Sequence, residues 1–85
     1  MKYQIEISKT AEKFLRKLSS RNFTLVANAI DSLSTDPYQI GIKKLKGYDN
    51  VFRLRAGNYR ILYEIDGGRL VVAVIEIGDR KNIYE

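Results

Sequence analysis

Residues 51–65 read VFRLRAGNYRILYEI, and this stretch decides the fold because it encodes two strands joined by a tight turn. The dipeptide Gly57-Asn58 suits a two-residue hairpin turn, and apolar and polar side chains alternate on either side of it. With this turn, Arg55 lies directly opposite Arg60, and the register of the whole hairpin follows. The remaining predicted pairs are Ala56 with Tyr59, Leu54 with Ile61, and Phe52 with Tyr63.

One face of this hairpin is predicted to be basic, because the register places Arg53, Arg55 and Arg60 on it together with Leu62 and Glu64. Like charges directly opposite each other destabilise a strand pair. Two interpretations are therefore open: three solvated arginines on an exposed sheet face, or a surface that receives an anion. Guanidinium groups bind phosphate oxygens bidentately, and the crowding of the arginines favours an anion-binding surface for RNA phosphates.

The first 35 residues predict a strand followed by two helices. Residues 3–7 alternate between apolar and polar, as in a strand with one buried face. Residues 11–18 and 23–33 repeat apolar side chains at the spacing of one-sided helices. Ser8 or Thr10 can cap the first helix, and the break between the helices is so short that we expect an antiparallel helix hairpin.

The second half of the chain predicts a loop and a last strand. Residues 36–50 are expected to form a loop, and Gly67-Gly68 a second two-residue turn. Residues 70–77 are almost wholly apolar, which predicts a central strand. Strict alternation would turn Leu70, Val72 and Val74 toward the helices, and Val71, Ala73, Ile75 and Ile77 toward the arginines. It would also put Glu64 and Glu76 on opposite faces of the sheet, which makes them a poor carboxylate pair.

These elements predict an α+β fold in a single domain over residues 1–85. The order is one strand, an antiparallel two-helix hairpin and a three-stranded antiparallel meander, which together form a four-stranded sheet. At 85 residues there is no room for a second domain, and a hydrophobic content of 45% is that of a globular protein.

The charge distribution also indicates a polyanion site. The net charge is +5, and residues 43–60 carry all of this excess, since the rest of the chain holds nine basic and nine acidic side chains. Clustering of this kind is the footprint of nucleic-acid binding, although a solvated, solubilising face is the alternative. Besides the arginines, this segment contributes Lys43, Lys44 and Lys46.

The chain lacks histidine and cysteine, which limits the catalytic and metal-binding functions that it can have. The chain has no histidine, so any catalysis proceeds without the commonest general base and the commonest metal ligand. It has no cysteine and no apolar signal or membrane-spanning stretch, which favours a soluble protein of the cytoplasm. We expect no metal and no cofactor.

RNA cleavage fits these residues if the 2′-hydroxyl attacks the phosphate, because arginines can stabilise the charge of the pentavalent transition state. Arginine stays protonated, so Arg53 and Arg55 are poor general bases. Tyr84 can exchange a proton or stack on a base. A tyrosine near a chain end is also commonly just packed or frayed, and that alternative stays open.

Three strings of residues resemble the RelE/ParE toxin superfamily. They are Lys44-Leu45-Lys46-Gly47, Val51 to Ile65 with its Gly-Asn-Tyr-Arg-Ile-Leu-Tyr run, and Gly78-Asp79-Arg80-Lys81-Asn82-Ile83-Tyr84. The resemblance covers nearly the whole chain, and the predicted order of elements is also similar to that fold.

The resemblance to the RelE-like members of type II toxin-antitoxin pairs implies a ribosome-dependent endoribonuclease. Such toxins cut messenger RNA in the ribosomal A site through 2′-hydroxyl attack and inhibit translation without a metal. It further implies a cognate RelB-like antitoxin in a heteromeric complex. The implied catalytic residues are Arg53, Arg55, Arg60, Arg80 and Tyr84, and the implied RNA-binding residues are Lys43, Lys44, Lys46 and Lys81.

Two departures from the RelE pattern matter. RelE has lysine where this chain has Arg53 and Arg55, so phosphate binding is preserved while a proton-accepting role is not. Asp79 stands where many relatives have histidine or lysine, and its carboxylate either weakens phosphate binding by Arg80 or orients the guanidinium. Two other functions stay open: a ParE-like, non-enzymatic inhibitor of DNA gyrase, and an inactive nucleic-acid-binding member of the superfamily.

Overall fold

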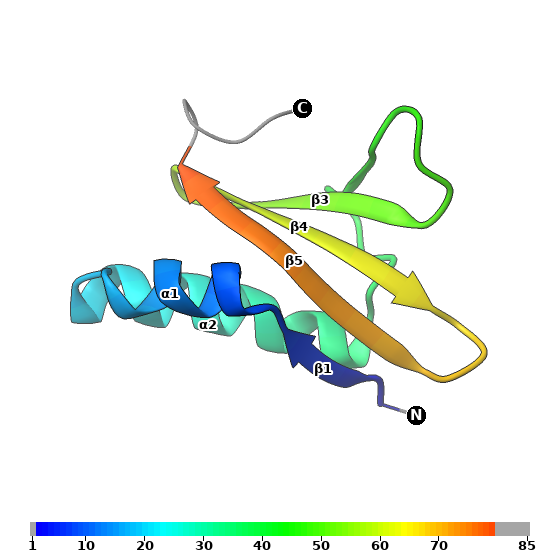
Figure 1. Cartoon of the computed structure of the whole chain (residues 1–85), viewed down its shortest axis with the longest axis horizontal. Helices are drawn as coiled ribbons and strands as arrows, with labels where there is room; N and C mark the ends of the chain where they lie inside the picture. Colours follow the sequence, from blue (N-terminus) through cyan, green and yellow to red (C-terminus); the bar gives the residue numbers. More distant parts are fainter. Residues whose placement is uncertain (1, 80–85) are drawn as a thin grey trace.

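Two helices lie against one face of a five-stranded sheet whose strand order is β1-β5-β4-β3-β2 (Figure 1). The structure is a computed structural model in which residues 2–79 are described. Its elements are β1 (Gln4–Ile7), α1 (Lys9–Arg16), α2 (Ser20–Thr35), β2 (Lys43–Lys44), β3 (Val51–Ala56), β4 (Tyr59–Asp66) and β5 (Val71–Asp79). The α+β class and the antiparallel helix hairpin are therefore confirmed.

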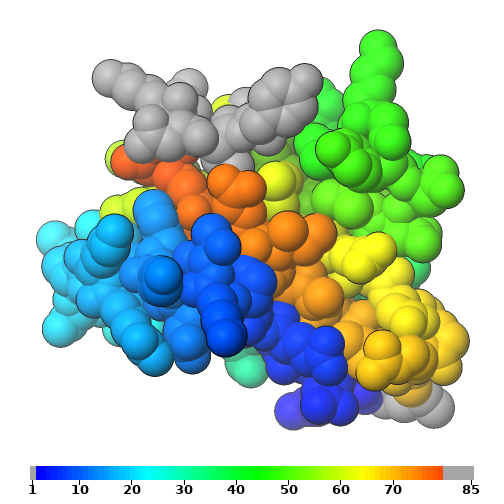
Figure 2. All heavy atoms as spheres, viewed as in Figure 1, coloured from blue at the N-terminus to red at the C-terminus, as the bar shows by residue number. Residues whose placement is uncertain are grey.

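Strand β5 is an interior strand of the sheet, as its apolar sequence predicted. It lies between β4, with which it is antiparallel, and β1, which runs parallel to it from the Gln4–Val71 pair to the Ile7–Val74 pair. In the space-filling view, strand β5 (orange) separates helix α1 (blue) from the segment around β3 (green) (Figure 2). The face of the sheet opposite the helices is thus left for the basic side chains.

The hairpin of β3 and β4 has the predicted register, including the pair of Arg55 with Arg60. Its turn is Gly57-Asn58, and Gly57 has a φ of +61°, a value that L residues rarely adopt. A Cβ at Gly57 would lie 2.7 Å from Leu25 Cδ2 of helix α2, so the turn also packs closely on the helix. The positive φ therefore favours glycine at this position, and a larger residue would also displace the end of the Leu25 side chain.

The predicted four-stranded sheet is wrong in its count, because the segment expected to be a loop contains a short edge strand. Strand β2 pairs antiparallel with β3, with Lys43 opposite Arg53 and Lys44 opposite Phe52. A two-residue strand shows no period-2 pattern, and lysine is uncommon in strands, so the sequence carried no signal for it. The strand consequently brings lysines to the edge of the sheet next to Arg53.

The connection between β4 and β5 is longer than predicted. Asp66 pairs with Val71, so residues 67–70 form a four-residue turn in place of the expected two-residue turn. Leu70, expected in the strand, belongs to this turn and has a φ of +56°. The Asp66 carboxylate accepts a hydrogen bond from the Arg69 backbone N–H at 3.0 Å, which closes the turn in a way that no Gly-Gly pattern reveals.

A β-bulge in β5 overturns the strict alternation that the sequence suggested. Tyr63 pairs with Val74 and the preceding Leu62 pairs with Glu76, which leaves Ile75 as the extra residue. Beyond the bulge the faces are exchanged, so Ile77 packs in the core on the helix side. Glu76 moves to the opposite face, which also carries the hairpin arginines.

The core lies between the helices and the sheet. Helix α1 is capped by Ser8, not Thr10, and helix α2 by Ser19; each serine hydroxyl accepts a hydrogen bond from the backbone N–H three residues later. The buried apolar residues of the helices are Ala11, Leu15, Val26, Ile30 and Leu33. Within residues 2–79, no helix is long and apolar enough to cross a membrane.

Candidate functional site

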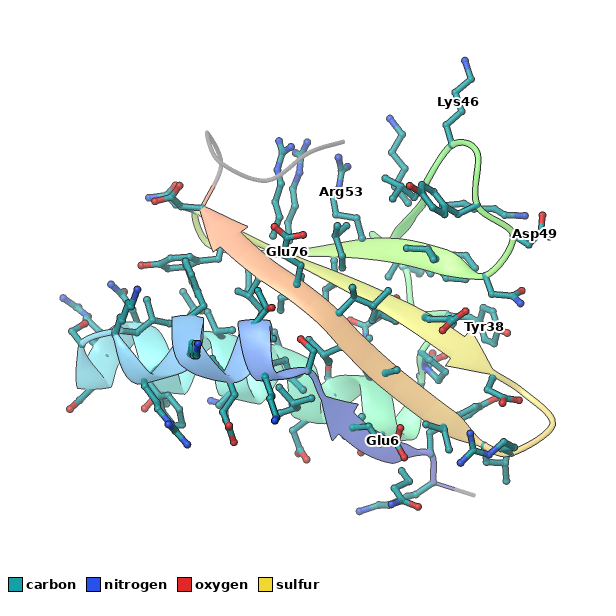
Figure 3. The ribbon with its side chains drawn as sticks, viewed as in Figure 1. Glu6, Tyr38, Lys46, Asp49, Arg53 and Glu76 are labelled. Atoms are coloured by element: carbon teal, nitrogen blue, oxygen red, sulfur yellow. The ribbon has the colours of Figure 1, made fainter. Side chains whose placement is uncertain are left out.

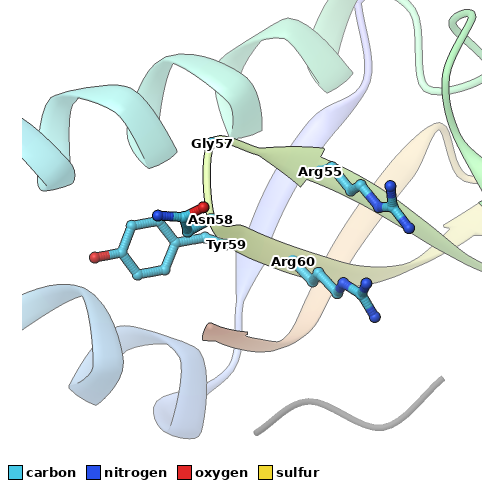
Figure 4. Close-up of a pocket in the computed structure, with 5 residues that line it drawn as sticks. All are labelled: Arg55, Gly57, Asn58, Tyr59 and Arg60. Carbon is cyan, nitrogen blue, oxygen red and sulfur yellow. The ribbon is translucent and has the colours of Figure 1, made fainter. Parts of the chain in front are cut away.

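The face of the sheet away from the helices carries a pair of arginines near the turn of the β3–β4 hairpin. Arg55 and Arg60 are directly opposite each other, and their side chains extend in the same direction (Figure 4). Together with Gly57, Asn58 and Tyr59 they line a pocket of about 150 Å³. Guanidinium groups bind phosphate oxygens bidentately, so two of them side by side at this pocket suit the binding of an anion.

The three hairpin arginines differ in exposure. Only 7% of the surface of Arg53 and of Arg60 is exposed, whereas Arg55 is exposed. This contradicts the interpretation of three solvated arginines. Burial restricts the rotamers of a long side chain, so the buried guanidinium groups are held in place before any ligand arrives. Arg55 remains accessible for direct contact with a ligand.

A second row runs across four strands of the same face. Lys43 lies opposite Arg53, Arg53 opposite Leu62, and Leu62 opposite Glu76. At the edge of this row, Lys43, Lys44, Leu45, Lys46 and Arg53 line a pocket of about 210 Å³. Strand β2 and the residues after it thus bring together three of the four predicted RNA-binding lysines and one predicted catalytic arginine, although Lys44, opposite Phe52, belongs by register to the other face.

The segment that carries these lysines is attached to the core through Tyr63. The Tyr63 hydroxyl donates a hydrogen bond of 2.8 Å to the Pro37 carbonyl oxygen, and its ring stacks on Phe52 with centroids 6.0 Å apart. Burial, with a smaller contribution from the nearby Asp36 carboxylate, raises the pKa of the Tyr63 phenol well above its usual range. Tyr63 is therefore a structural anchor and not a group that exchanges protons near neutral pH.

Glu76 was not predicted as a site residue, because parity placed it away from the arginines. The bulge turns it onto their face, where it lies on the same side of the sheet as Arg53 (Figure 3). Glu64 is also on this face, opposite Val51, so the prediction that the two glutamates lie on opposite faces is wrong. No sequence pattern distinguishes a bulged strand from a regular one here.

The remaining predicted site residues, Arg80, Lys81 and Tyr84, lie outside the described residues. Asp79 pairs with Tyr59 at the end of β5, and its buried Oδ1 atom has no hydrogen-bond partner within residues 2–79. In the same range, no group of three or more histidine, cysteine, aspartate or glutamate side chains is arranged to hold a metal ion.

Known proteins share both the sequence pattern and the fold. The pattern of the family described as ParE toxin of type II toxin-antitoxin system, parDE, matches residues 5–84. Toxin RelG of Mycobacterium tuberculosis is 32% identical over 85 residues, which cover 99% of this chain and 98% of that protein. The chain therefore belongs to the ParE toxin family, and the resemblance to the RelE/ParE superfamily is confirmed.

Solved structures agree with this assignment. The toxin-antitoxin complex RelBE2 of Mycobacterium tuberculosis contains a chain that is 30% identical, with a TM-score of 0.81 and coverage of 94% of this chain and 100% of that one. The archaeal RelE-RelB complex of Pyrococcus horikoshii has a TM-score of 0.82 with coverage of 98% and 100%. At 24% identity, the archaeal structure bears on the fold alone.

Proposed function

We propose that this chain is a toxin that cleaves messenger RNA in the ribosomal A site. The observation that carries the proposal is the pair of Arg55 and Arg60 at the hairpin tip, with Arg60 and the nearby Arg53 buried and so held in fixed positions. Cations held in fixed positions can stabilise the negative charge that develops in a transition state, whereas non-specific binding of a polyanion does not need fixed positions. The cleavage requires no metal and takes place in the cytoplasm.

The roles of the residues follow from their chemistry. The 2′-oxygen attacks the adjacent phosphorus, and the two hairpin-tip arginines bind the non-bridging oxygens of the phosphate. Arg53 and Arg80 add positive charge around the same group. Tyr84 donates a proton to the leaving 5′-oxygen or stacks on a neighbouring base.

The lysines are proposed to bind RNA on either side of the scissile phosphate. Lys43, Lys44 and Lys46 lie around the second pocket at the sheet edge, and Lys81 is close in sequence to the catalytic Arg80 and Tyr84. Contacts of this kind hold the backbone in register and carry no sequence information. The choice of cleavage position would then come from the ribosome and the codon that it presents.

The proposed partner outside the ribosome is an antitoxin that inhibits the toxin in a heteromeric complex. The solved relative from Mycobacterium tuberculosis is the toxin-antitoxin complex RelBE2. A flexible acidic segment fits the basic face of this chain by charge, and covering that face would exclude RNA.

Primer extension on translating ribosomes tests the proposed cleavage. We expect the wild-type chain to produce new 3′ ends in the A-site codon, and Arg55→Ala, an exposed position in which folding should be retained, to reduce them strongly. Arg80→Ala is expected to have a similar effect. Lys13→Ala, which removes an exposed charge from helix α1, is the matched control. Undiminished cutting by the arginine variants would refute the proposal.

The alternative function is ParE-like inhibition of DNA gyrase, which the match to the ParE family pattern favours. A supercoiling assay with the purified chain separates the two functions, since a ribonuclease leaves gyrase turnover unchanged. Inhibited supercoiling without cleaved message would support the gyrase function. Binding of RNA without cleavage or gyrase inhibition would instead indicate an inactive nucleic-acid-binding member of the family.

A further inference from the structure

We propose that Glu76 is the general base that removes the proton from the attacking 2′-hydroxyl. This assignment rests on the proposed ribonuclease function, for which the residues named so far include no acceptor for the 2′-hydroxyl proton. The hairpin arginines remain protonated and cannot accept a proton, and the chain contains no histidine. A carboxylate can accept this proton, and the bulge in β5 places one on the basic face.

The register sets the distance of Glu76 from the arginines. Arg60 pairs with Gly78, and Glu76 lies two residues before Gly78 on the same face of β5. Glu76 and Arg60 are therefore diagonal neighbours, about 7–8 Å apart between their Cα atoms. Because Gly78 has no side chain, nothing rises from β5 directly opposite Arg60. A phosphate bound by Arg60 can thus lie beside the Glu76 carboxylate.

The surroundings of Glu76 leave its carboxylate available. The side chain is exposed and makes no hydrogen bond or ion pair with another residue of the described part of the chain. Its neighbour across the strand pair is the buried Leu62, which offers no polar group. Figure 3 shows Glu76 near the sheet surface and Arg53 extending further from it on the same side.

Glu64 is the other carboxylate on this face, and its position argues against the same role. It lies four residues from Arg60 along β4, about 13 Å at the rise of a strand. It lines a different cavity, with Tyr38, Asn50 and Asp66 at the far end of the hairpin. Glu64 is thus a carboxylate on the same face but remote from the arginine pair, which makes it the matched control.

The 2′-oxygen forms a bond to phosphorus as its proton moves to the Glu76 carboxylate, and the bond from phosphorus to the 5′-oxygen breaks. The leaving 5′-oxygen takes a proton from the Tyr84 hydroxyl. Solvent then returns a proton to Tyr84 and accepts the proton that Glu76 holds. The products are a 2′,3′-cyclic phosphate and a 5′-hydroxyl end, and no oxidant, reductant or metal is consumed.

Single-turnover cleavage on programmed ribosomes, with saturating toxin, tests the assignment. We expect Glu76→Gln to lower the rate constant by roughly 10²–10⁴-fold, the usual contribution of general acid-base catalysis, while ribosome binding is equal or tighter. Glu64→Gln should cut within a few-fold of wild type. Equal rates for the Glu76→Gln and Glu64→Gln variants would overturn the proposal.

Chemical rescue separates a base from a residue that only offsets the arginine charges. We expect added formate to restore part of the rate of Glu76→Ala, whereas chloride at the same ionic strength does not. A charge-compensating glutamate would instead give a variant of lowered melting temperature that formate does not accelerate, and that result would overturn the proposal. If Glu76→Gln does not fold, the rescue experiment on Glu76→Ala decides, and a folded Glu76→Ala that formate does not accelerate would refute the proposal.

The same experiment distinguishes this assignment from the proposed function. A wild-type chain that cuts while Glu76→Gln cuts equally well contradicts only the role of Glu76. A wild-type chain that cuts no ribosome-bound message contradicts the ribonuclease function, and the assignment falls with it.

Discussion

The Ser8 hydroxyl donates a hydrogen bond of 2.6 Å to the carbonyl oxygen of Ile75, the extra residue of the bulge in β5. The same hydroxyl accepts a hydrogen bond of 3.0 Å from the Ala11 backbone N–H and so caps helix α1. The Ser8 backbone N–H donates to the Val74 carbonyl oxygen at 2.9 Å. Ser8 thus connects the start of helix α1 to the β5 bulge, which turns Glu76 onto the basic face.

Ser8→Ala is predicted to lower both stability and cleavage. Loss of an N-cap costs about 0.5–2 kcal/mol, and the Ile75 carbonyl is deprived of its hydrogen-bond donor in addition. Because the bulge loses its side-chain hydrogen bond and keeps only the backbone bond from residue 8 to Val74, we expect Glu76 to be less well positioned and cleavage to fall several-fold at temperatures where the variant is folded. Urea unfolding and single-turnover cleavage measure the two effects.

Ser19→Ala is the matched control for Ser8→Ala. Ser19 caps helix α2 through the Asn22 backbone N–H at 3.3 Å, far from the bulge. We expect a loss of about 1 kcal/mol in the free energy of unfolding and no change in cleavage by the folded protein. If both variants lost cleavage equally, the link between Ser8 and the site would be disproved.

Tyr63→Phe is predicted to destabilise the chain at neutral pH and to change the response to alkali. Loss of the hydrogen bond to the Pro37 carbonyl should cost about 0.5–1.5 kcal/mol. The pKa of Tyr63 is raised by burial, so above about pH 10 the unfolded chain releases a proton that the folded chain retains. The free energy of unfolding of the wild type therefore decreases there, by up to about 1.4 kcal/mol per pH unit from this group.

Urea unfolding at a neutral and at an alkaline pH checks this prediction. The Tyr63→Phe variant lacks the group, so its unfolding free energy should decrease less between the two conditions. Tyr48→Phe, at an exposed position, is the control and should follow the wild type. Identical pH dependence of wild type and Tyr63→Phe would contradict the assigned cause.

Gly57→Ala is predicted to destabilise the hairpin that carries the arginine pair. A φ of +61° costs an L residue about 1–2 kcal/mol, and the new Cβ would also meet Leu25. Gly67→Ala is the comparison, since a Cβ there meets no atom within 4 Å and the φ is not positive. A thermal melt should show a clear loss for Gly57→Ala and little change for Gly67→Ala. Adding Leu25→Ala to Gly57→Ala should remove the clash with the new Cβ but not the cost of the positive φ.

Lys43→Ala is predicted to weaken RNA binding through its charge alone. Lys43 lies opposite Arg53 on the basic face and is exposed, so folding should be unaffected. Removing one lysine that neutralises a phosphate of single-stranded RNA reduces the slope of log affinity against log salt by about 0.7. Filter binding over a salt series measures this slope, with Lys13→Ala on helix α1 as the control. An unchanged slope for Lys43→Ala would remove this lysine from the binding surface.

The sequence alone determined the hairpin and its basic face. Alternation around Gly57-Asn58 fixed the register, because a one-residue slip would have exposed the apolar set of side chains and buried the arginines. The helices followed from their apolar spacing, and the interior position of β5 followed from its apolar composition. The hairpin, the helices and the position of this strand all depend on interactions between residues close in sequence or on the burial of apolar side chains.

The tertiary structure decided the bulge and the edge strand. Both depend on partners distant in sequence: Ser8 holds the Ile75 carbonyl from 67 residues away, and the pairing of Lys43 with Arg53 defines a strand too short to show a period. A single extra residue in β5 exchanged the faces of everything after it, which moved Ile77 into the core and Glu76 onto the basic face. The sequence thus specified where the arginines lie, and only the folded chain placed Glu76 on the same face.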